Sequence, residues 1–362
     1  MSMKLLHVVG ARPNFMKVAP VHAAFARTPG FTQVLVHTGQ HYDANMSDVF
    51  FQELGIPAPD VNLTVGSGTH AQQTAEVMTR FEEVVATDRP DMVLVYGDVN
   101  STVAAALVCA KLLIPVSHVE AGLRSRDRTM PEEVNRLLTD QLADLLLTPS
   151  TDGDENLKNE GRPAQAIHFV GNVMIDTLIR SLSLSKPPPF DLPPRFALVT
   201  LHRPSNVDDA AGLRELLDAL ADVARGTDVL FPVHPRTRKQ IAELGFDAPP
   251  GLRLLDPVGY LQFLYLQQRA AVVVTDSGGI QEETTYLRVP CVTMRENTER
   301  PITVTVGTNV LAGKDVKRMR ELVGQALSGD WKNGEIPPLW DGKAGERIVE
   351  VVRSYLSSRT AS

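Results

Sequence analysis

The chain alternates short apolar runs, rich in β-branched residues, with longer segments whose apolar residues recur at helical spacing. Strand, helix and strand in this order predict βαβ units, parallel sheets and right-handed crossovers. The first half has such apolar runs at residues 4–10, 32–39, 92–98, 114–121, 145–150 and 167–172. The second half has them at residues 195–202, 228–235, 252–257, 271–278 and 289–295. We therefore expect an α/β protein, with its first helices starting from about Asn14 and near Asn45.

A proline-rich stretch, KPPPFDLPP at residues 186–194, separates the two series. Its five prolines cannot continue a helix or a central strand, which predicts a hinge linker. The expected fold is two Rossmann-like, doubly wound domains, at residues 1–185 and 195–340, that face a cleft. Residues 341–362 are predicted to form a helix that packs back on the first domain.

Composition narrows the class of ligand. A formal net charge of -7 argues against a general nucleic-acid binder but permits a small anion held by local cations. The uncharged apolar run at residues 103–110 is too short to span a membrane, and the apolar stretch near the N-terminus is too short for a signal peptide. Cys109 and Cys291 lie in apolar segments and indicate core positions. These features predict a cytoplasmic protein without membrane or nucleic-acid partners.

The stretch AAVVVTDSGGIQEE, residues 270–283, predicts a nucleotide site in the second half. A buried strand ends at Thr275–Asp276, and Ser277, Gly278 and Gly279 then open a helix with no bulky side chain. Such a helix N-terminus offers free N–H groups and a positive dipole end to a phosphate. Glu282 and Glu283 lie one turn further on, where a carboxylate can accept hydrogen bonds from ribose hydroxyls.

Three acids in the first half are candidates for acid–base chemistry. Asp98 and Glu120 follow two apolar runs that predict neighbouring strands, and Glu132 lies in the first turn of a helix opened by Pro131. Asp98 or Asn100 could instead be only an N-cap, and acids such as Glu132 suit a helix N-terminus without any further role. Together, however, the three would converge on one sheet edge, where like charges raise one another's pKa.

Basic residues also occur where strands are predicted to end. GARPNFMK carries Arg12 and Lys17 and matches neither a G-x-G-x-x-G nor a Walker pattern. In the second half such positions hold a set of further basic residues, for which contact with a ligand and a purely structural role are both open: His202, Arg203, His234, Arg236, Arg238 and Arg300. His37 and His41 flank a glycine turn and not a zinc helix, so no metal site is predicted.

The ordered set of motifs resembles the non-hydrolysing UDP-N-acetylglucosamine 2-epimerases over nearly the whole chain. The motifs are GARPNFMK, TGQHYDANM, VYGDVNST, HVEAGLRS, MPEEVNR, VTLHRPSN, PVHPRT, TDSGGIQEE and TERP. The resemblance implies a fold of the glycosyltransferase-B type, a homodimer, and an active site in the interdomain cleft. It implies interconversion of UDP-N-acetylglucosamine and UDP-N-acetylmannosamine for polysaccharide precursor supply, with neither metal nor nicotinamide cofactor.

The resemblance also implies a mechanism and roles for residues. A base removes the C2 proton while UDP leaves C1, and UDP and a proton then return to a glycal intermediate, which requires at least two acid–base groups. The matching catalytic positions are Asp98, Glu120, Glu132 and His202. The matching positions for binding the UDP-sugar are Arg12, Lys17, Arg124, His234, Ser277, Gly278, Gly279, Glu283 and Arg300. Among these, Glu283 matches the ribose-binding acid, and His202 lies by the diphosphate.

Two departures from the family pattern bear on the substrate. The stretch LTVGSGTHAQQT lacks the arginine that substrate-activated bacterial members carry shortly before the helix near His70, although Gln40 and His41 are kept. GARPNFMK, TGQHYDANM and LHRPSN look closer to a branch that includes epimerases of modified sugars such as UDP-2,3-diacetamido-glucuronate. The alternatives are therefore an epimerase of such a modified sugar and a glycosyltransferase of the same fold, with a hydrolysing epimerase or a non-catalytic sensor beyond these.

Overall fold

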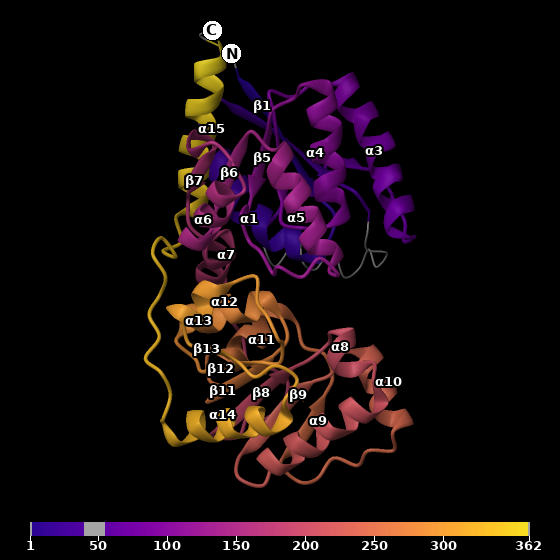
Figure 1. The fold of residues 1–362 in the computed structure, drawn as a ribbon, viewed down its shortest axis with the longest axis vertical. Helices are drawn as coiled ribbons and strands as arrows, with labels where there is room; N and C mark the ends of the chain where they lie inside the picture. The colour runs from indigo at the N-terminus through magenta and orange to yellow at the C-terminus, as the bar shows by residue number, and fades with distance from the viewer. Residues whose placement is uncertain (1, 40–54, 361–362) are drawn as a thin grey trace. The chain divides into compact units, whose positions relative to one another are not determined.

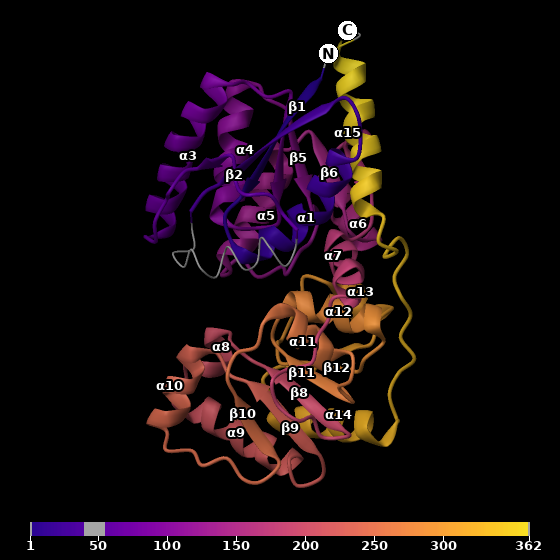
Figure 2. The same ribbon diagram turned by 180° about the vertical axis from the view of Figure 1, so that it is seen from behind.

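The computed structural model describes residues 2–39 and 55–360, which fall into two compact units. Unit 1 runs to Thr177 and takes up the chain again from Pro338, and unit 2 comprises Leu178–Pro337. Helix α7 (Val173–Leu182) therefore contains one unit boundary. Figures 1 and 2 show the C-terminal helix α15 (Ala344–Thr360) returning to the elements of unit 1. The helix expected near Asn45 lies outside the described residues.

Unit 1 is built on a parallel sheet whose described strands are arranged in the order β3-β2-β1-β4-β5-β6-β7. The strands are β1 (Met3–Val9), β2 (Phe31–His37), β3 (Val61–Asn62), β4 (Met92–Tyr96), β5 (Val116–Val119), β6 (Leu145–Thr148) and β7 (Ile167–Phe169). The order reverses between β1 and β4. In open α/β sheets such a reversal marks where ligands bind, outside the carboxyl ends of the strands.

Helices cover both faces of this sheet. Helices α3 (His70–Thr87), α4 (Asn100–Leu112) and α5 (Pro131–Leu142) form one layer, and α1 (Arg12–Ala26) packs beside α15 on the other. The remaining elements of the unit are α6 (Thr151–Asn159) and the short 3-10 helix Ala164–Ala166. Helix α1 begins two residues before the expected position at Asn14, because Pro13 suits the first turn.

Unit 2 repeats this plan with the described strand order β10-β9-β8-β11-β12-β13, again parallel. Its strands are β8 (Phe196–Thr200), β9 (Asp228–Pro232), β10 (Leu252–Leu255), β11 (Val272–Thr275), β12 (Cys291–Thr293) and β13 (Asn309–Leu311). Its helices are α8 (Pro204–Val207), α9 (Ala210–Val223), α10 (Pro235–Glu243), α11 (Tyr260–Gln267), α12 (Gly278–Leu287), α13 (Pro301–Thr305) and α14 (Val316–Ser328). The strand order here reverses between β8 and β11, so a second sheet edge at which a ligand is expected lies beside Ser277.

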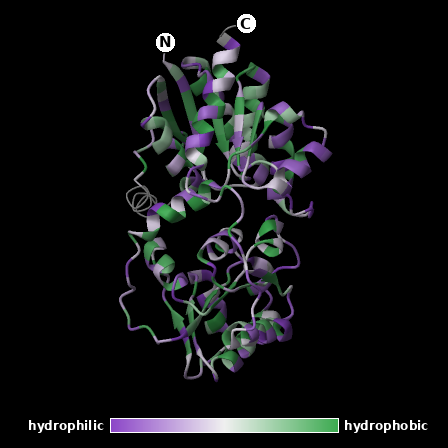
Figure 3. Ribbon diagram, turned by 90° about the vertical axis from the view of Figure 1, so that its left-hand side faces the viewer, coloured by the Kyte–Doolittle hydropathy of each residue, from purple (hydrophilic) through white to green (hydrophobic). Residues whose placement is uncertain are grey.

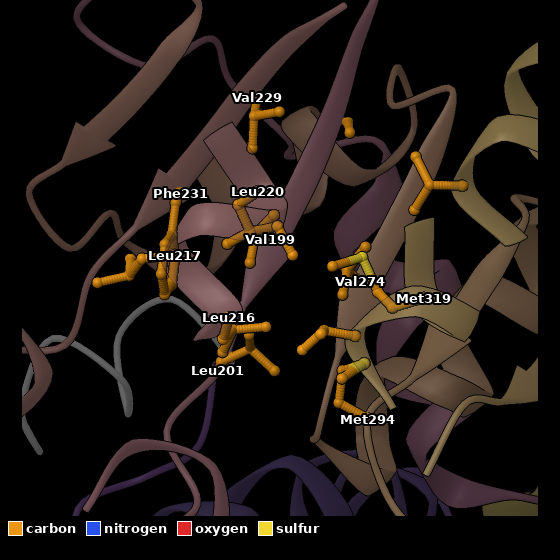
Figure 4. Close-up of a cluster of buried hydrophobic side chains, with 14 of the residues drawn as sticks. Val199, Leu201, Leu216, Leu217, Leu220, Val229, Phe231, Val274, Met294 and Met319 are labelled. Atoms are coloured by element: carbon orange, nitrogen blue, oxygen red, sulfur yellow. The ribbon is translucent and has the colours of Figure 1, made fainter. Parts of the chain in front are cut away.

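The core of unit 2 explains its apolar patterning. Figure 3 shows that the strands are largely hydrophobic, as expected for parallel strands covered on both faces. On one face, α9 and α14 pack on Val199, Val274 and their neighbours (Figure 4). The stripe of α9 at helical spacing is buried as predicted: Leu213, Leu216, Leu217 and Leu220. The other face holds a separate cluster around Leu198 and Val273, against which Phe190 of the proline-rich segment packs.

The proline-rich segment forms neither helix nor strand and lies within unit 2. Besides the packing of Phe190, the Arg253 guanidinium donates to the Asp191 carbonyl at 2.8 Å. Both cysteines are buried, as their apolar context predicted. Among the described residues, no helix is both long and apolar enough to cross a membrane.

Candidate active site

In unit 1, Asn14 connects the loops that follow β1 and β4, the two strands between which the strand order reverses. Its side-chain oxygen accepts hydrogen bonds from the N–H groups of Gly10 and Ala11, directly after β1. Its amide nitrogen donates to the carbonyl of Tyr96 at 2.8 Å, at the end of β4. Arg12, a predicted substrate contact, is the first residue of α1 at this edge. This buried asparagine therefore ties together the two loops that flank the expected ligand edge, a role that its motif did not reveal.

Glu120 directly follows β5, which pairs with β4 as the sequence predicted. Its side chain is buried and lies 2.7 Å from the Lys17 ammonium. Its backbone is in the left-handed region, with φ of 73°, a conformation that a side chain with a Cβ rarely adopts. Strained residues of this kind persist where the surrounding structure holds them and often mark functional sites.

Lys17, a predicted contact of the UDP-sugar, thus forms an ion pair with Glu120, a candidate catalytic carboxylate. Its ammonium lies against the backbone of Gly97, where a Cβ would overlap Nζ. Gly97 itself has φ of 63°, so both its conformation and the space beside it favour glycine. The glycine of YGD therefore seats the lysine that pairs with Glu120.

Asp98 is paired with Arg136, a residue that the sequence did not single out. The Arg136 guanidinium lies 2.5 Å from the Asp98 carboxylate and 2.8 Å from that of Glu133. Asn135 also donates to the Asp98 carbonyl at 2.9 Å. The alternative role of Asp98 as an N-cap is not what the structure has, because α4 is capped by Val99 without a side-chain hydrogen bond. Two residues of helix α5, Asn135 and Arg136, thus hold Asp98.

Glu133 anchors Arg136 in turn. Its carboxylate accepts from the Ser125 N–H at 2.9 Å, the Ser125 hydroxyl at 3.0 Å and the Arg126 N–H at 2.9 Å. Burial works against its ionisation, but these donors and Arg136 hold the pKa of Glu133 below its usual value. Glu132, by contrast, is exposed in the first turn of α5, which opens with Pro131 as predicted. The two adjacent glutamates therefore have different environments.

Arg124 belongs to a buried network below this edge. Its guanidinium lies 2.7 Å from Asp140 and donates to Glu160 at 2.8 and 2.6 Å. Asp140 also lies 2.6 Å from Nδ1 of His118, whose Nε2 lies 2.8 Å from the Gly97 carbonyl. Although burial opposes it, His118 and Arg124 keep the pKa of Asp140 below its usual value. Arg124 was predicted to contact substrate, but its donors are engaged within unit 1, and we propose a structural role for it.

The second ligand edge lies in unit 2, at the ends of β8 and β11. His202 follows β8, and Asp276 and Ser277 follow β11, its paired neighbour. Helix α12 begins at Gly278 with Ser277 as its N-cap, and no side chain caps its first N–H groups. The predicted phosphate cradle thus stands at the sheet reversal, where ligands of such folds bind.

Arg300 lies against the first turn of α12. A Cβ on Gly278 would be 2.5 Å from Nη1 of Arg300 and 2.8 Å from a Glu299 oxygen. The guanidinium is held by Glu299 at 2.6 Å and by Glu282 at 3.0 Å. The N-terminus of α12 suits an anion, and two carboxylates hold one buried guanidinium beside it and offset its charge.

Glu283 is buried and accepts a hydrogen bond from the Tyr260 hydroxyl at 3.0 Å. Burial raises the pKa of this carboxyl to about 7, even though Tyr260 and Gln267 lower it. Tyr260 was not expected from the sequence. A buried carboxyl with a pKa raised in this way is a feature of functional sites, and in its ionised form it can accept hydrogen bonds from the hydroxyls of a ligand.

The remaining basic residues of unit 2 are mostly paired. His234 is exposed and caps α10 by accepting from the Arg236 N–H at 3.3 Å. Arg236 pairs with Asp208 at 2.6 Å, and Arg238 pairs with Asp256 at 3.2 Å. The expected basic rim is therefore partly neutralised. Among the described residues, no group of three His, Cys, Asp or Glu side chains could hold a metal ion. Gln40 and His41 lie outside the described residues.

Comparison with known proteins identifies the family. The profile of the UDP-N-acetylglucosamine 2-epimerases matches residues 23–353 of the chain. The chain belongs to this family. The expectation drawn from its motifs is thereby confirmed, as is the two-sheet α/β fold.

Individual relatives agree with this assignment. A UDP-2,3-diacetamido-2,3-dideoxy-D-glucuronate 2-epimerase of Pseudomonas aeruginosa is 44% identical over 96% of this chain and 99% of its own. A UDP-N-acetylglucosamine 2-epimerase of Methanocaldococcus jannaschii is 40% identical over 97% of this chain and 99% of its own.

Solved structures extend the agreement to three dimensions. The crystal structure of the M. jannaschii enzyme in complex with UDP-GlcNAc and UDP has a TM-score of 0.85 and 38% identity, covering 97% of this chain and all of that one. A lipopolysaccharide outer core galactosyltransferase has a TM-score of 0.55 at 15% identity, covering 98% of this chain and all of that one. The latter likeness shows the fold alone, so it lends no support to glycosyl transfer.

Proposed function

We propose that the chain interconverts UDP-N-acetylglucosamine and UDP-N-acetylmannosamine by elimination and re-addition of UDP. The observation that carries the proposal is the pair of carboxylates on the neighbouring strand ends of β4 and β5, each with its own buried cation. Two differently placed acid–base groups are what removal and return of a proton on opposite faces of C2 requires. The family match supports the same reaction.

The acid–base steps are assigned to unit 1. One carboxylate removes the C2 proton as the C1–O bond breaks and its electron pair leaves with UDP. A second group then delivers a proton to the opposite face of C2 as UDP returns to C1. We propose that Asp98, Glu120 and Glu132 supply these groups. Lys17 and Arg136 hold two of them in place, at 2.7 and 2.5 Å.

Binding of UDP is assigned to unit 2. Ser277, Gly278 and Gly279 offer the N-terminus of α12 to the diphosphate, and Arg300 adds a fixed positive charge beside it. Fixed donors and charge of this kind stabilise a leaving group without reorganisation. Glu283 accepts the ribose hydroxyls, and His202 contacts the diphosphate. The residues of this unit therefore bind the leaving group, whereas the acid–base steps that define the reaction belong to unit 1.

A second substrate is favoured by one observation, the 44% identity to an epimerase of UDP-2,3-diacetamido-2,3-dideoxy-D-glucuronate. That sugar differs from N-acetylglucosamine by an acetamido group at C3 and a carboxylate at C6. The two candidates share the C2 chemistry and the UDP, so the same carboxylates serve either. Comparing kcat/KM for the two UDP-sugars decides between them.

Heavy water provides the test of the reaction itself. Incubation with UDP-N-acetylglucosamine in deuterium oxide should place deuterium at C2 and yield the manno epimer. Glu120→Gln should slow this exchange while leaving UDP affinity close to that of the unsubstituted chain. Absence of exchange with both candidate sugars, despite tight UDP binding, would instead support a sensor. Release of free UDP and N-acetylmannosamine would support a hydrolysing enzyme. The homodimer implied by the resemblance is part of the proposal and is tested by sedimentation.

A further inference from the structure

Asp276 of the TDSGG motif has a role in neither the sequence analysis nor the proposed function. It lies at the end of β11, immediately before the phosphate cradle, and its side chain is fully buried. A buried carboxylate is costly unless it is hydrogen-bonded or paired. The contacts that compensate this one should therefore indicate its purpose.

Those contacts converge from the loop after β8. One carboxylate oxygen accepts from the N–H groups of His202 at 3.0 Å and Arg203 at 2.9 Å, and from the Asn206 amide at 3.0 Å. The other oxygen lies 2.9 Å from Nδ1 of the His202 ring. Asn206 also donates to the Met294 carbonyl after β12, so three strand ends are joined at this one carboxylate.

The contacts also decide how the His202 ring is held. Burial opposes ionisation of Asp276, but the ring of His202, the Asn206 amide and the Arg203 N–H together keep its pKa below the usual value. An ionised carboxylate accepts hydrogen bonds and donates none, so Nδ1 of His202 must carry the hydrogen between them. Half of the His202 side chain, 51%, is exposed. Nε2 is therefore the ring nitrogen left for a ligand.

We propose that Asp276 is a positioning residue that fixes the orientation and tautomer of His202, so that Nε2 faces the diphosphate. The inference rests on the proposed function, in which His202 contacts the leaving UDP. When the C1–O bond breaks, negative charge grows on the β-phosphate. The ring, which takes a proton from solvent at Nε2 before UDP leaves, donates this Nε2–H to a phosphate oxygen, and the Asp276 carboxylate balances the charge of the protonated ring. An aspartate that orients a histidine in this way is familiar from other enzymes.

The first test uses the unsubstituted protein and needs no activity. Nitrogen-15 NMR of the His202 ring should show a proton on Nδ1 both before and after UDP is added. The addition of UDP should shift the Nε2 resonance. A neutral ring that carries its proton on Nε2 would overturn the inference. Lack of epimerisation by the same sample would overturn the proposed function instead, so the two failures are distinguishable.

The second test is a double-mutant cycle on kcat. Asp276→Asn should lower kcat by about 10- to 100-fold, the loss that follows removal of an orienting partner from a metal-bound histidine. In a His202→Asn background the same substitution should change kcat by less than about threefold, because Asp276 acts through the ring. An equal loss in both backgrounds would show that Asp276 only holds the loop, and would refute the inference.

Asp315→Asn is the matched control. Asp315 also accepts two consecutive backbone N–H groups, those of Lys317 and Arg318 at 2.8 and 3.0 Å, but it does so at the start of α14. Its substitution should leave kcat unchanged in both backgrounds. Thermal unfolding of each variant establishes that it is folded. If the Asp276→Asn variant does not fold, the NMR measurement on the unsubstituted chain decides whether Asp276 orients His202.

Discussion

Replacing Gly278 with alanine would test whether Arg300 delivers its charge to UDP. The added Cβ would lie 2.5 Å from Nη1 of Arg300 and 3.0 Å from Cζ, whereas ordinary contacts begin at 3.4 Å. The guanidinium must therefore retreat by roughly 0.9 Å, the difference between 3.4 and 2.5 Å. It cannot do so freely, because Glu282 and Glu299 hold it at 3.0 and 2.6 Å.

The size of the effect follows from what a displaced guanidinium loses. A hydrogen bond to a charged group contributes about 1.5–3 kcal/mol, and each 1.4 kcal/mol is tenfold in affinity. We therefore expect Gly278→Ala to raise the Kd for UDP by about 10- to 100-fold. The backbone gives no reason for such a loss, since Gly278 is helical and alanine favours a helix over glycine by up to about 1 kcal/mol.

Isothermal titration with UDP measures this directly. Gly324→Ala is the matched control, because Gly324 lies in helix α14 of the same unit and a Cβ there would meet nothing within 4 Å. The control should bind UDP as the unsubstituted chain does and be slightly more stable. If Gly278→Ala bound UDP within about twofold of the control, Arg300 would have no part in holding the nucleotide.

Three further predictions concern the other groups of the site. Gly97→Ala should push the Lys17 ammonium from Glu120 and lower kcat by about 100-fold, measured as deuterium exchange at C2. Gly161→Ala, which has a similar φ of 80° but open space, should share the backbone strain and keep its kcat. Because burial raises the pKa of Glu283 to about 7, UDP binding should strengthen and release protons from about pH 6 to about pH 8 in calorimetry, and Glu283→Gln should abolish this. The same carboxyl has an unfolded pKa of 4.5, below its folded one, so its contribution to folding stability should fall as pH rises from about 4.5 to about 7, lowering the Tm of the free protein. Arg136→Lys should lower kcat by about 10-fold or more and leave the Kd for UDP unchanged, since it disturbs only the bridge from Asp98 to Glu133.

The positions of the candidate residues along the fold could be predicted from the sequence because strand ends are visible in it. An apolar run that stops at a polar residue marks the carboxyl end of a parallel strand, and ligands of such folds bind there. Asp98, Glu120, His202 and Ser277 were all found in this way, and each lies where a strand of the structure ends. The start of α5 at Pro131 could also be predicted from the sequence, because proline suits a first helical turn.

The partners of these residues could not be predicted, because they depend on register between distant elements. Arg136 meets Asp98 from 38 positions away, and Asp276 meets the His202 N–H from 74 positions away. One local signal was available, since Glu133 and Arg136 are three apart and share a helix face. That spacing distinguishes Glu133, which can pair with Arg136 on one helix face, from the adjacent Glu132, which is exposed. For Arg124 the motif suggested a ligand contact, which stays a prediction, and its pairing with Asp140 and Glu160 could not be predicted from that motif.

The same pairings bear on the choice between the two sugars. The three buried cations that the structure describes in unit 1 are Lys17, Arg124 and Arg136, and each lies within 2.7 Å of a carboxylate. A substrate with a carboxylate at C6 needs a cation to balance it wherever that carboxylate is withdrawn from water, because an uncompensated buried charge is costly. Taking one of these three would leave Glu120, Asp140 or Asp98 unbalanced. The neutral sugar, UDP-N-acetylglucosamine, needs no further cation, whereas the glucuronate would need one from outside this buried set, although a relative acting on the glucuronate is 44% identical.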